Sequence, residues 1–72
     1  MSPTVFREGP IRYFFFSREE PRIHIHALGP QGEAKFWIFP AVSVANNCGF
    51  SDEELNRLIR TIEAHKEEIV NA

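Results

Sequence analysis

The stretch IHIHALGPQGEAKFWIF, residues 23–39, decides the fold of this 72-residue chain. It begins by alternating apolar and polar side chains, which is typical of a strand with one buried face. Glycine and proline interrupt the pattern at residues 29–32 and predict a tight turn. The run at residues 33–39 ends at Pro40 and predicts the returning strand of a β-hairpin.

The turn also predicts the register of this hairpin. Pairing Leu28 with Glu33 puts six apolar residues on one face: Ile23, Ile25, Ala27, Ala34, Phe36 and Ile38. A slip by one residue would mix apolar and polar side chains on each face, so the pattern specifies the register. On the opposite face the same register places two pairs: His24 opposite Trp37, and His26 opposite Lys35.

A second hairpin is predicted at the start of the chain, where Gly9 and Pro10 separate two runs of β-prone residues. The expected pairs are Glu8 with Ile11, Phe6 with Tyr13, and Thr4 with Phe15. In the second run the odd positions are the more uniformly apolar, so we expect them in the interior. The even positions, Arg12, Phe14 and Phe16, are then expected on the other face.

The C-terminal part carries a clear helix signal. Ser51 and Glu54 form a capping-box pattern, and an apolar stripe follows at helical spacing: Leu55, Leu58, Ile59, Ile62 and Ile69. Residues 41–50 suit either a strand or a short helix and are treated as a connector. We therefore predict one α+β domain over residues 1–72. A four-stranded antiparallel meander (1–40) and the connector (41–50) precede a helix (51–71) packed on one sheet face in two layers.

Composition excludes several protein classes. Hydrophobic residues make up 43% and charged residues 25% of the chain, which is ordinary for a globular domain. No apolar run approaches the roughly 20 residues of a membrane helix. One cysteine excludes an internal disulfide and favours the cytoplasm. The net charge of −2 argues against nucleic acid as a partner, although residues 1–50 carry +1 and residues 51–72 carry −3.

Because one helix covers one sheet face, we expect the other face to be open. So small a chain has a small core, and oligomerisation would stabilise it. We therefore predict a homodimer, or a complex with a small partner protein, in which this face is the interface. The candidate interface residues are Phe14, His24, His26, Lys35, Trp37 and Phe39.

The histidines leave the enzyme question open. His24 and His26 lie two positions apart on one strand face and are candidate metal ligands if Glu33 or a partner chain supplies a third. With Arg12 and Lys35 they are candidate catalytic residues for acid–base chemistry on a phosphodiester, in an RNA-acting enzyme. No motif for a cofactor is present, and none is expected.

Several segments together resemble a known family of small prokaryotic proteins. They are the opening residues 1–9, the aromatic strand 12–16, the Pro-x-x-His-x-His motif at 21–26, the Glu-Ala-Lys-Phe-Trp motif at 33–37, and Gly-Phe-Ser at 49–51. The family is called domain of unknown function 4160. The resemblance implies His24, His26, Glu33, Lys35 and Trp37 as signature residues. It also implies a gene neighbour in a toxin–antitoxin-like pair, and it brings no established reaction.

Overall fold

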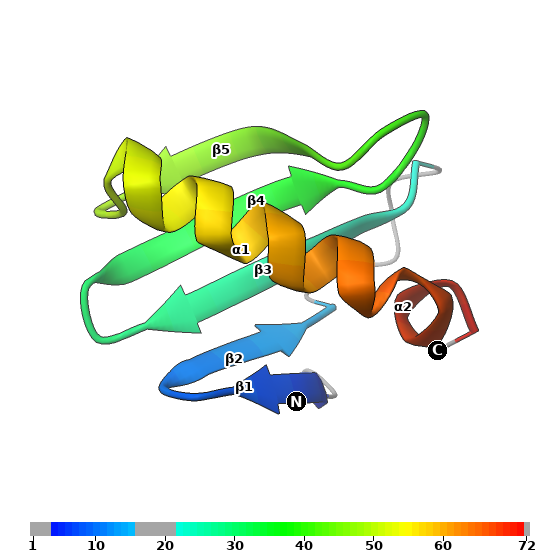
Figure 1. The fold of residues 1–72 in the computed structure, drawn as a ribbon, viewed down its shortest axis with the longest axis horizontal. Coiled ribbons are helices and arrows are strands. Elements are labelled where there is room, and N and C mark those ends of the chain that lie inside the picture. Colours follow the sequence, from blue (N-terminus) through cyan, green and yellow to red (C-terminus); the bar gives the residue numbers. More distant parts are fainter. Residues whose placement is uncertain (1–3, 16–21, 72) are drawn as a thin grey trace.

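Five antiparallel strands and two helices make up the part of the chain that the computed structural model describes, residues 4–15 and 22–71. The elements are β1 (Thr4–Glu8), β2 (Ile11–Phe14), β3 (His24–Gly29), β4 (Gly32–Trp37), β5 (Ser43–Cys48), α1 (Asp52–Ala64) and α2 (Lys66–Asn71). The strands pair in chain order, and α1 crosses one face of the sheet (Figure 1). The α+β class is confirmed. The expected count of four strands is wrong, because residues 43–48 form a fifth strand.

The central hairpin has the predicted register. Leu28 pairs with Glu33, and Ile25 pairs with Phe36. Ile25, Phe36 and Ile38 are fully buried, so the apolar face of this hairpin forms the centre of the core. Ile23 lies just before β3 and is 37% exposed, although its carbonyl oxygen still accepts a hydrogen bond from the Ile38 amide at 3.2 Å.

The first hairpin departs from the predicted register at one end. Glu8 pairs with Ile11 and Phe6 with Tyr13, as expected, but a bulge between Thr4 and Phe6 pairs Thr4 with Phe14 instead of Phe15. One extra residue in an edge strand shifts every pair beyond it. Odd positions of β2 do face the core: Ile11 and Tyr13 are buried there, and Phe15 packs against the same cluster. The prediction for Phe16 lies outside the described residues.

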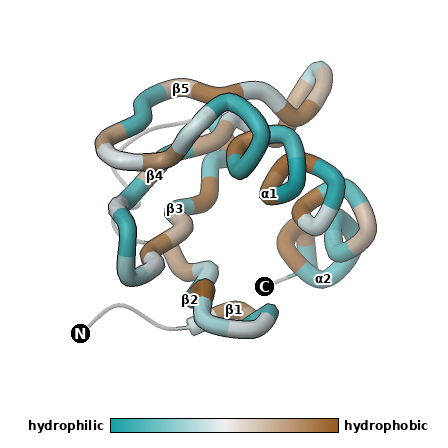
Figure 2. Tube along the Cα trace, turned by 60° about the vertical axis from the view of Figure 1, so that its left-hand side comes forward, coloured by the Kyte–Doolittle hydropathy of each residue, from teal (hydrophilic) through white to brown (hydrophobic). Residues whose placement is uncertain are grey.

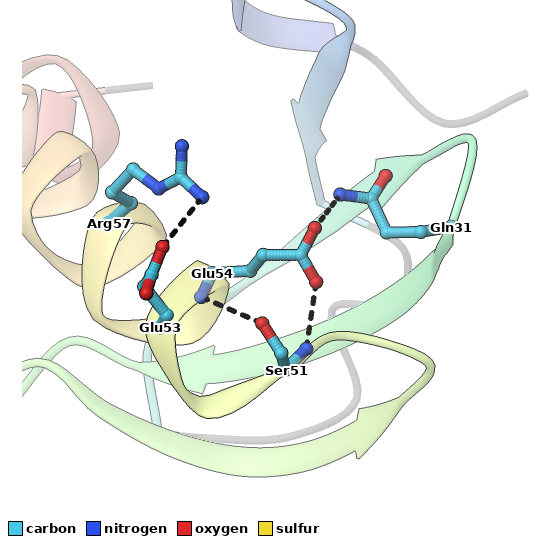
Figure 3. A network of polar contacts seen from close by, with 5 residues as sticks. All are labelled: Gln31, Ser51, Glu53, Glu54 and Arg57. Carbon is cyan, nitrogen blue, oxygen red and sulfur yellow. Dashed lines mark hydrogen bonds and ion pairs between the residues drawn. The ribbon is translucent and has the colours of Figure 1, made fainter.

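Helix α1 begins at the predicted cap. Ser51 Oγ accepts a hydrogen bond from the Glu54 amide, and Glu54 Oε1 accepts one from the Ser51 amide (Figure 3). The single helix expected over residues 51–71 is wrong, since the helix breaks at His65. The His65 ring stacks on Phe6 with ring centroids 4.1 Å apart, and the chain changes direction there (Figure 1). Beyond the break Ile69 is fully buried.

Two glycines bring the β3–β4 turn against the end of β5. A Cβ atom on Gly32 would overlap the Cys48 carbonyl oxygen, and one on Gly49 would overlap the Gln31 carbonyl oxygen. Gly49 also has a φ of 109°, which favours glycine. This close approach seats Gln31 beside α1, where its amide Nε2 donates a hydrogen bond to Glu54 Oε2 at 2.7 Å (Figure 3).

The core lies between the sheet and the helices. Apolar segments occur in both layers, as Figure 2 shows by hydropathy. Leu55, Leu58 and Ile62 of α1 are buried in one cluster with the apolar face of β2, β3 and β4. Strand β5 contributes little to this core, since all six of its residues are exposed. Within the described ranges, no helix has the length and apolar character needed to cross a membrane.

Candidate functional site

The sheet face opposite the helices carries most of the predicted site residues. We call it the histidine–tryptophan face and define it by six residues: Arg12, Phe14, His24, His26, Lys35 and Trp37. Strand pairing brings them together, because Phe14 pairs with His26, His26 with Lys35, and His24 with Trp37. Their alternation with core residues along each strand follows from the two-residue period of β-structure.

The aromatic rings of this face are covered by cations. The Arg12 guanidinium carbon lies 4.5 Å from the centroid of the Phe14 ring. Trp37 has two such neighbours, the Arg22 guanidinium carbon at 4.4 Å and Lys35 Nζ at 4.7 Å. Cation–π contacts of this kind contribute about 0.5–1 kcal/mol at exposed sites. Cations therefore lie beside both of these rings, and Phe14 itself is buried in the chain.

Arg22 is a site residue that the sequence analysis missed. Its Nε and Nη2 atoms donate hydrogen bonds to the Phe39 carbonyl oxygen at 3.1 and 2.8 Å, which holds the guanidinium beside Trp37. The sequence did contain a pattern that places Arg22 on this face, because Arg22 lies two residues before His24. The alternation that places His24 and His26 on one face extends back to Arg22.

His24 is a buried side chain with one defined hydrogen bond. It is 4% exposed, and its Nδ1 atom lies 3.2 Å from the Arg22 carbonyl oxygen. A carbonyl oxygen only accepts, so Nδ1 carries a proton, and in the neutral form of the ring Nε2 holds the lone pair. Among the described residues Nε2 has no hydrogen-bond partner, and it is buried. Its ring meets those of His26 and Trp37 edge-on, at centroid distances of 5.4 and 6.0 Å.

His26 lies beside an acidic and an aromatic side chain. Its Nδ1 atom is 3.7 Å from Glu33 Oε2, and its ring stacks on Phe14 with centroids 5.4 Å apart. The His26 side chain is 12% exposed, against 50% for Glu33. Both histidines are thus packed into the sheet surface and are not solvated on it.

Phe39 lies apart from the other predicted interface residues. It follows the end of β4 and is 42% exposed, and Lys66 Nζ of α2 lies 4.5 Å from its ring centroid. Strand β4 ends at Trp37, and although Ile38 is still buried in the core as the alternation predicts, Phe39 departs from the alternation and lies beside α2.

The geometry limits the chemistry available here. A metal site needs several ligands around one point, and residues 4–15 and 22–71 hold no group of three His, Cys, Asp or Glu side chains so arranged. In the neutral ring the Nε2 atom of His24 would have the lone pair that a general base needs, but a substrate cannot reach this buried atom in the present conformation. What the face offers directly is a set of cations on an aromatic base.

Comparison with known protein families gives a match. The model of the family described as Domain of unknown function (DUF4160) matches residues 10–72, which include every residue of the histidine–tryptophan face. No match is found among curated proteins or among solved structures.

Proposed function

We propose that this chain, which belongs to the DUF4160 family, is a protein-interaction module that binds an acidic surface of a partner protein through its histidine–tryptophan face. The observation that carries the proposal is the pair of cations, Arg22 and Lys35, that both lie over the Trp37 ring.

This arrangement has the properties of an interface centre. Tryptophan and arginine are the side chains most enriched among residues that dominate binding energy. The hydrogen bonds from Arg22 to the Phe39 carbonyl oxygen position the guanidinium before a partner arrives. Pre-positioning reduces the conformational entropy lost on binding. A carboxylate on the partner would then meet two positive charges on an apolar base.

The charge pattern favours a partner of different sequence over a symmetric dimer. In a symmetric contact between two copies of this face, the cations Arg22 and Lys35 of one copy would lie in the same interface as those of the other, and like charges in an interface disfavour association. The homodimer expected from the sequence therefore becomes the competing outcome. The family resemblance supports the same choice, since it implies a small protein from a neighbouring gene in a toxin–antitoxin-like pair.

An RNA-acting enzyme is the second candidate. It is favoured by the fixed tautomer of His24, whose Nε2 lone pair lies on the same face as Arg12 and Lys35. Histidine and cations together serve phosphodiester cleavage, in which a proton moves and negative charge develops. This candidate requires the side chains over His24 to move before RNA reaches Nε2.

Trp37 makes the proposal testable, because it is the only tryptophan in the chain and its fluorescence reports on this face alone. We would titrate the chain with a glutamate-rich peptide, a single-stranded RNA of equal charge and an uncharged peptide. We expect the acidic peptide to change the fluorescence saturably. Arg22→Gln should weaken its binding about fivefold, the equivalent of one cation contact.

Arg60→Gln is the matched control, since Arg60 is exposed on α1. It should leave binding within about twofold of the unaltered chain. Unchanged binding by Arg22→Gln, or saturable binding of RNA alone, would contradict the proposal. Sedimentation would show the competing outcome, a dimer at micromolar concentration whose formation shifts the Trp37 emission.

A further inference from the structure

A pocket on the helix side of the sheet is separate from the histidine–tryptophan face. It has a volume of about 190 Å³ and lies where the β1–β2 turn, the β3–β4 turn and the first half of α1 meet. We call it the turn pocket. Its apolar wall consists of Tyr13, Phe50 and Leu58, which are all buried core residues.

The polar rim of the turn pocket carries two carboxylates. Glu8 comes from the end of β1, and Glu54 from the first turn of α1. The Glu54 carboxylate is held in place by hydrogen bonds from the Ser51 amide and from Gln31 Nε2 (Figure 3). Each of its oxygens keeps a further lone pair for a ligand. The Glu8 carboxylate has no hydrogen bond or ion pair to any described residue, yet its charge acts on the pocket, since it contributes to raising the pKa of Tyr13.

Arg57 is the one cation among the described residues that line the turn pocket, and it is already paired. Arg57 Nη2 lies 3.8 Å from Glu53 Oε1, on the side of α1 next to the Gln31–Glu54 contact (Figure 3). Arg57 and Glu53 together are neutral, so the two remaining carboxylates leave the pocket with an excess of negative charge. Apolar surface ending in negative charge suits a ligand whose alkyl part ends in a cation.

We propose that the turn pocket binds an alkylammonium or alkylguanidinium group. The alkyl part lies on Tyr13, Phe50 and Leu58. The cationic head lies next to the Glu8 carboxylate, and the Glu54 carboxylate is the second negative charge near it. Such a group is carried by a lysine or arginine side chain of a partner protein and by free aliphatic amines. This site is independent of the proposed function, because it uses the opposite side of the sheet and the opposite charge.

The test is an amide chemical-shift titration of the whole chain with n-butylammonium chloride, using n-butanol as the neutral probe of equal shape. We expect saturable shifts at Glu8, Gln31 and Leu58 with butylammonium and much weaker binding of butanol. Glu8→Gln should weaken butylammonium binding by up to about fivefold, since an exposed charge pair contributes up to about 1 kcal/mol. Arg57→Gln should strengthen it, because it removes the positive charge from the rim.

Glu63→Gln is the matched control, because Glu63 is an exposed carboxylate of the same helix outside the pocket lining. It should change binding by less than about twofold. An acetylated Gly-Lys-Gly peptide and cadaverine then separate the two sources, since binding of the peptide indicates a protein side chain and binding of cadaverine alone indicates a free amine. The proposal is overturned if butanol binds as well as butylammonium, or if Glu8→Gln binds like the unaltered chain.

Discussion

The sole tyrosine gives the most direct test of how the core is built. Tyr13 is 1% exposed, its ring stacks on Phe6 at 4.4 Å, and its hydroxyl is hydrogen-bonded to the Thr61 side chain. Burial, with a smaller contribution from the charge of Glu8, raises the pKa of Tyr13 from 10.0 to about 12, although the hydrogen bond to Thr61 acts in the opposite direction. Ionising this phenol therefore opposes folding.

The sign and size of the effect follow from linkage between protonation and folding. The pKa is higher in the folded chain, so the unfolded chain loses its phenolic proton first as the pH rises. The contribution is fully present below pH 10 and is lost between about pH 10 and 12. With these values the loss in unfolding free energy is about 1.4 kcal/mol at pH 11, and it approaches about 2.7 kcal/mol above pH 12.

Two assays measure the raised pKa of Tyr13 and its effect on the unfolding free energy. Absorbance at 295 nm follows tyrosinate formation, and only Tyr13 contributes. We expect a midpoint near 12 in the folded chain and near 10 in denaturant.

The second assay is urea unfolding followed by circular dichroism at several pH values, which should show the loss of unfolding free energy in the unaltered chain. The Tyr13→Phe variant should lack this component and keep only the alkaline dependence that lysines produce in both proteins. A folded-state midpoint near 10, or the same pH dependence in both proteins, would refute a buried, neutral Tyr13.

Two further predictions concern the turn and the cap. Gly32→Ala should lower the unfolding free energy by about 1–3 kcal/mol, because its Cβ would meet the Cys48 carbonyl backbone. In urea unfolding it should cost more than Gly9→Ala, whose Cβ meets no atom within 4 Å and which carries only the backbone strain of a φ of 58°, and equal losses would count against the close approach of turn and strand. Ser51→Ala should cost about 1 kcal/mol in thermal unfolding by removing the cap hydrogen bond to Glu54, whereas Ser43→Ala on exposed β5 should be nearly neutral. A neutral Ser51→Ala would mean that the capping box adds no stability.

Elements whose stabilising interactions are local could be read from the sequence. The β3–β4 register follows from a short turn and a strict two-residue alternation, and the predicted pairs from His24–Trp37 to Leu28–Glu33 are present. The start of α1 follows from a cap whose partners, Ser51 and Glu54, lie three residues apart. The division of β2 into a core side and an outer side followed from the apolar character of its odd positions.

Strand β5 could not be read in this way. All six of its residues are exposed, so it has no alternation of buried and exposed side chains for a pattern to detect. It is held by pairing with β4, which includes a bulge, and by the approach of Gly49 to the β3–β4 turn. Both depend on residues distant in sequence.

For the candidate sites, the sequence by itself determined which side chains share the histidine–tryptophan face, because strand periodicity is a property of the local backbone. Only the tertiary structure decided how deeply these side chains are buried and which charged groups lie beside them. It placed Arg22 and Lys35 over Trp37, buried the His24 ring, moved Phe39 beside α2, and formed the turn pocket from three separate segments. Burial and the distance between charges depend on atoms from distant parts of the chain, so a local sequence pattern does not predict them.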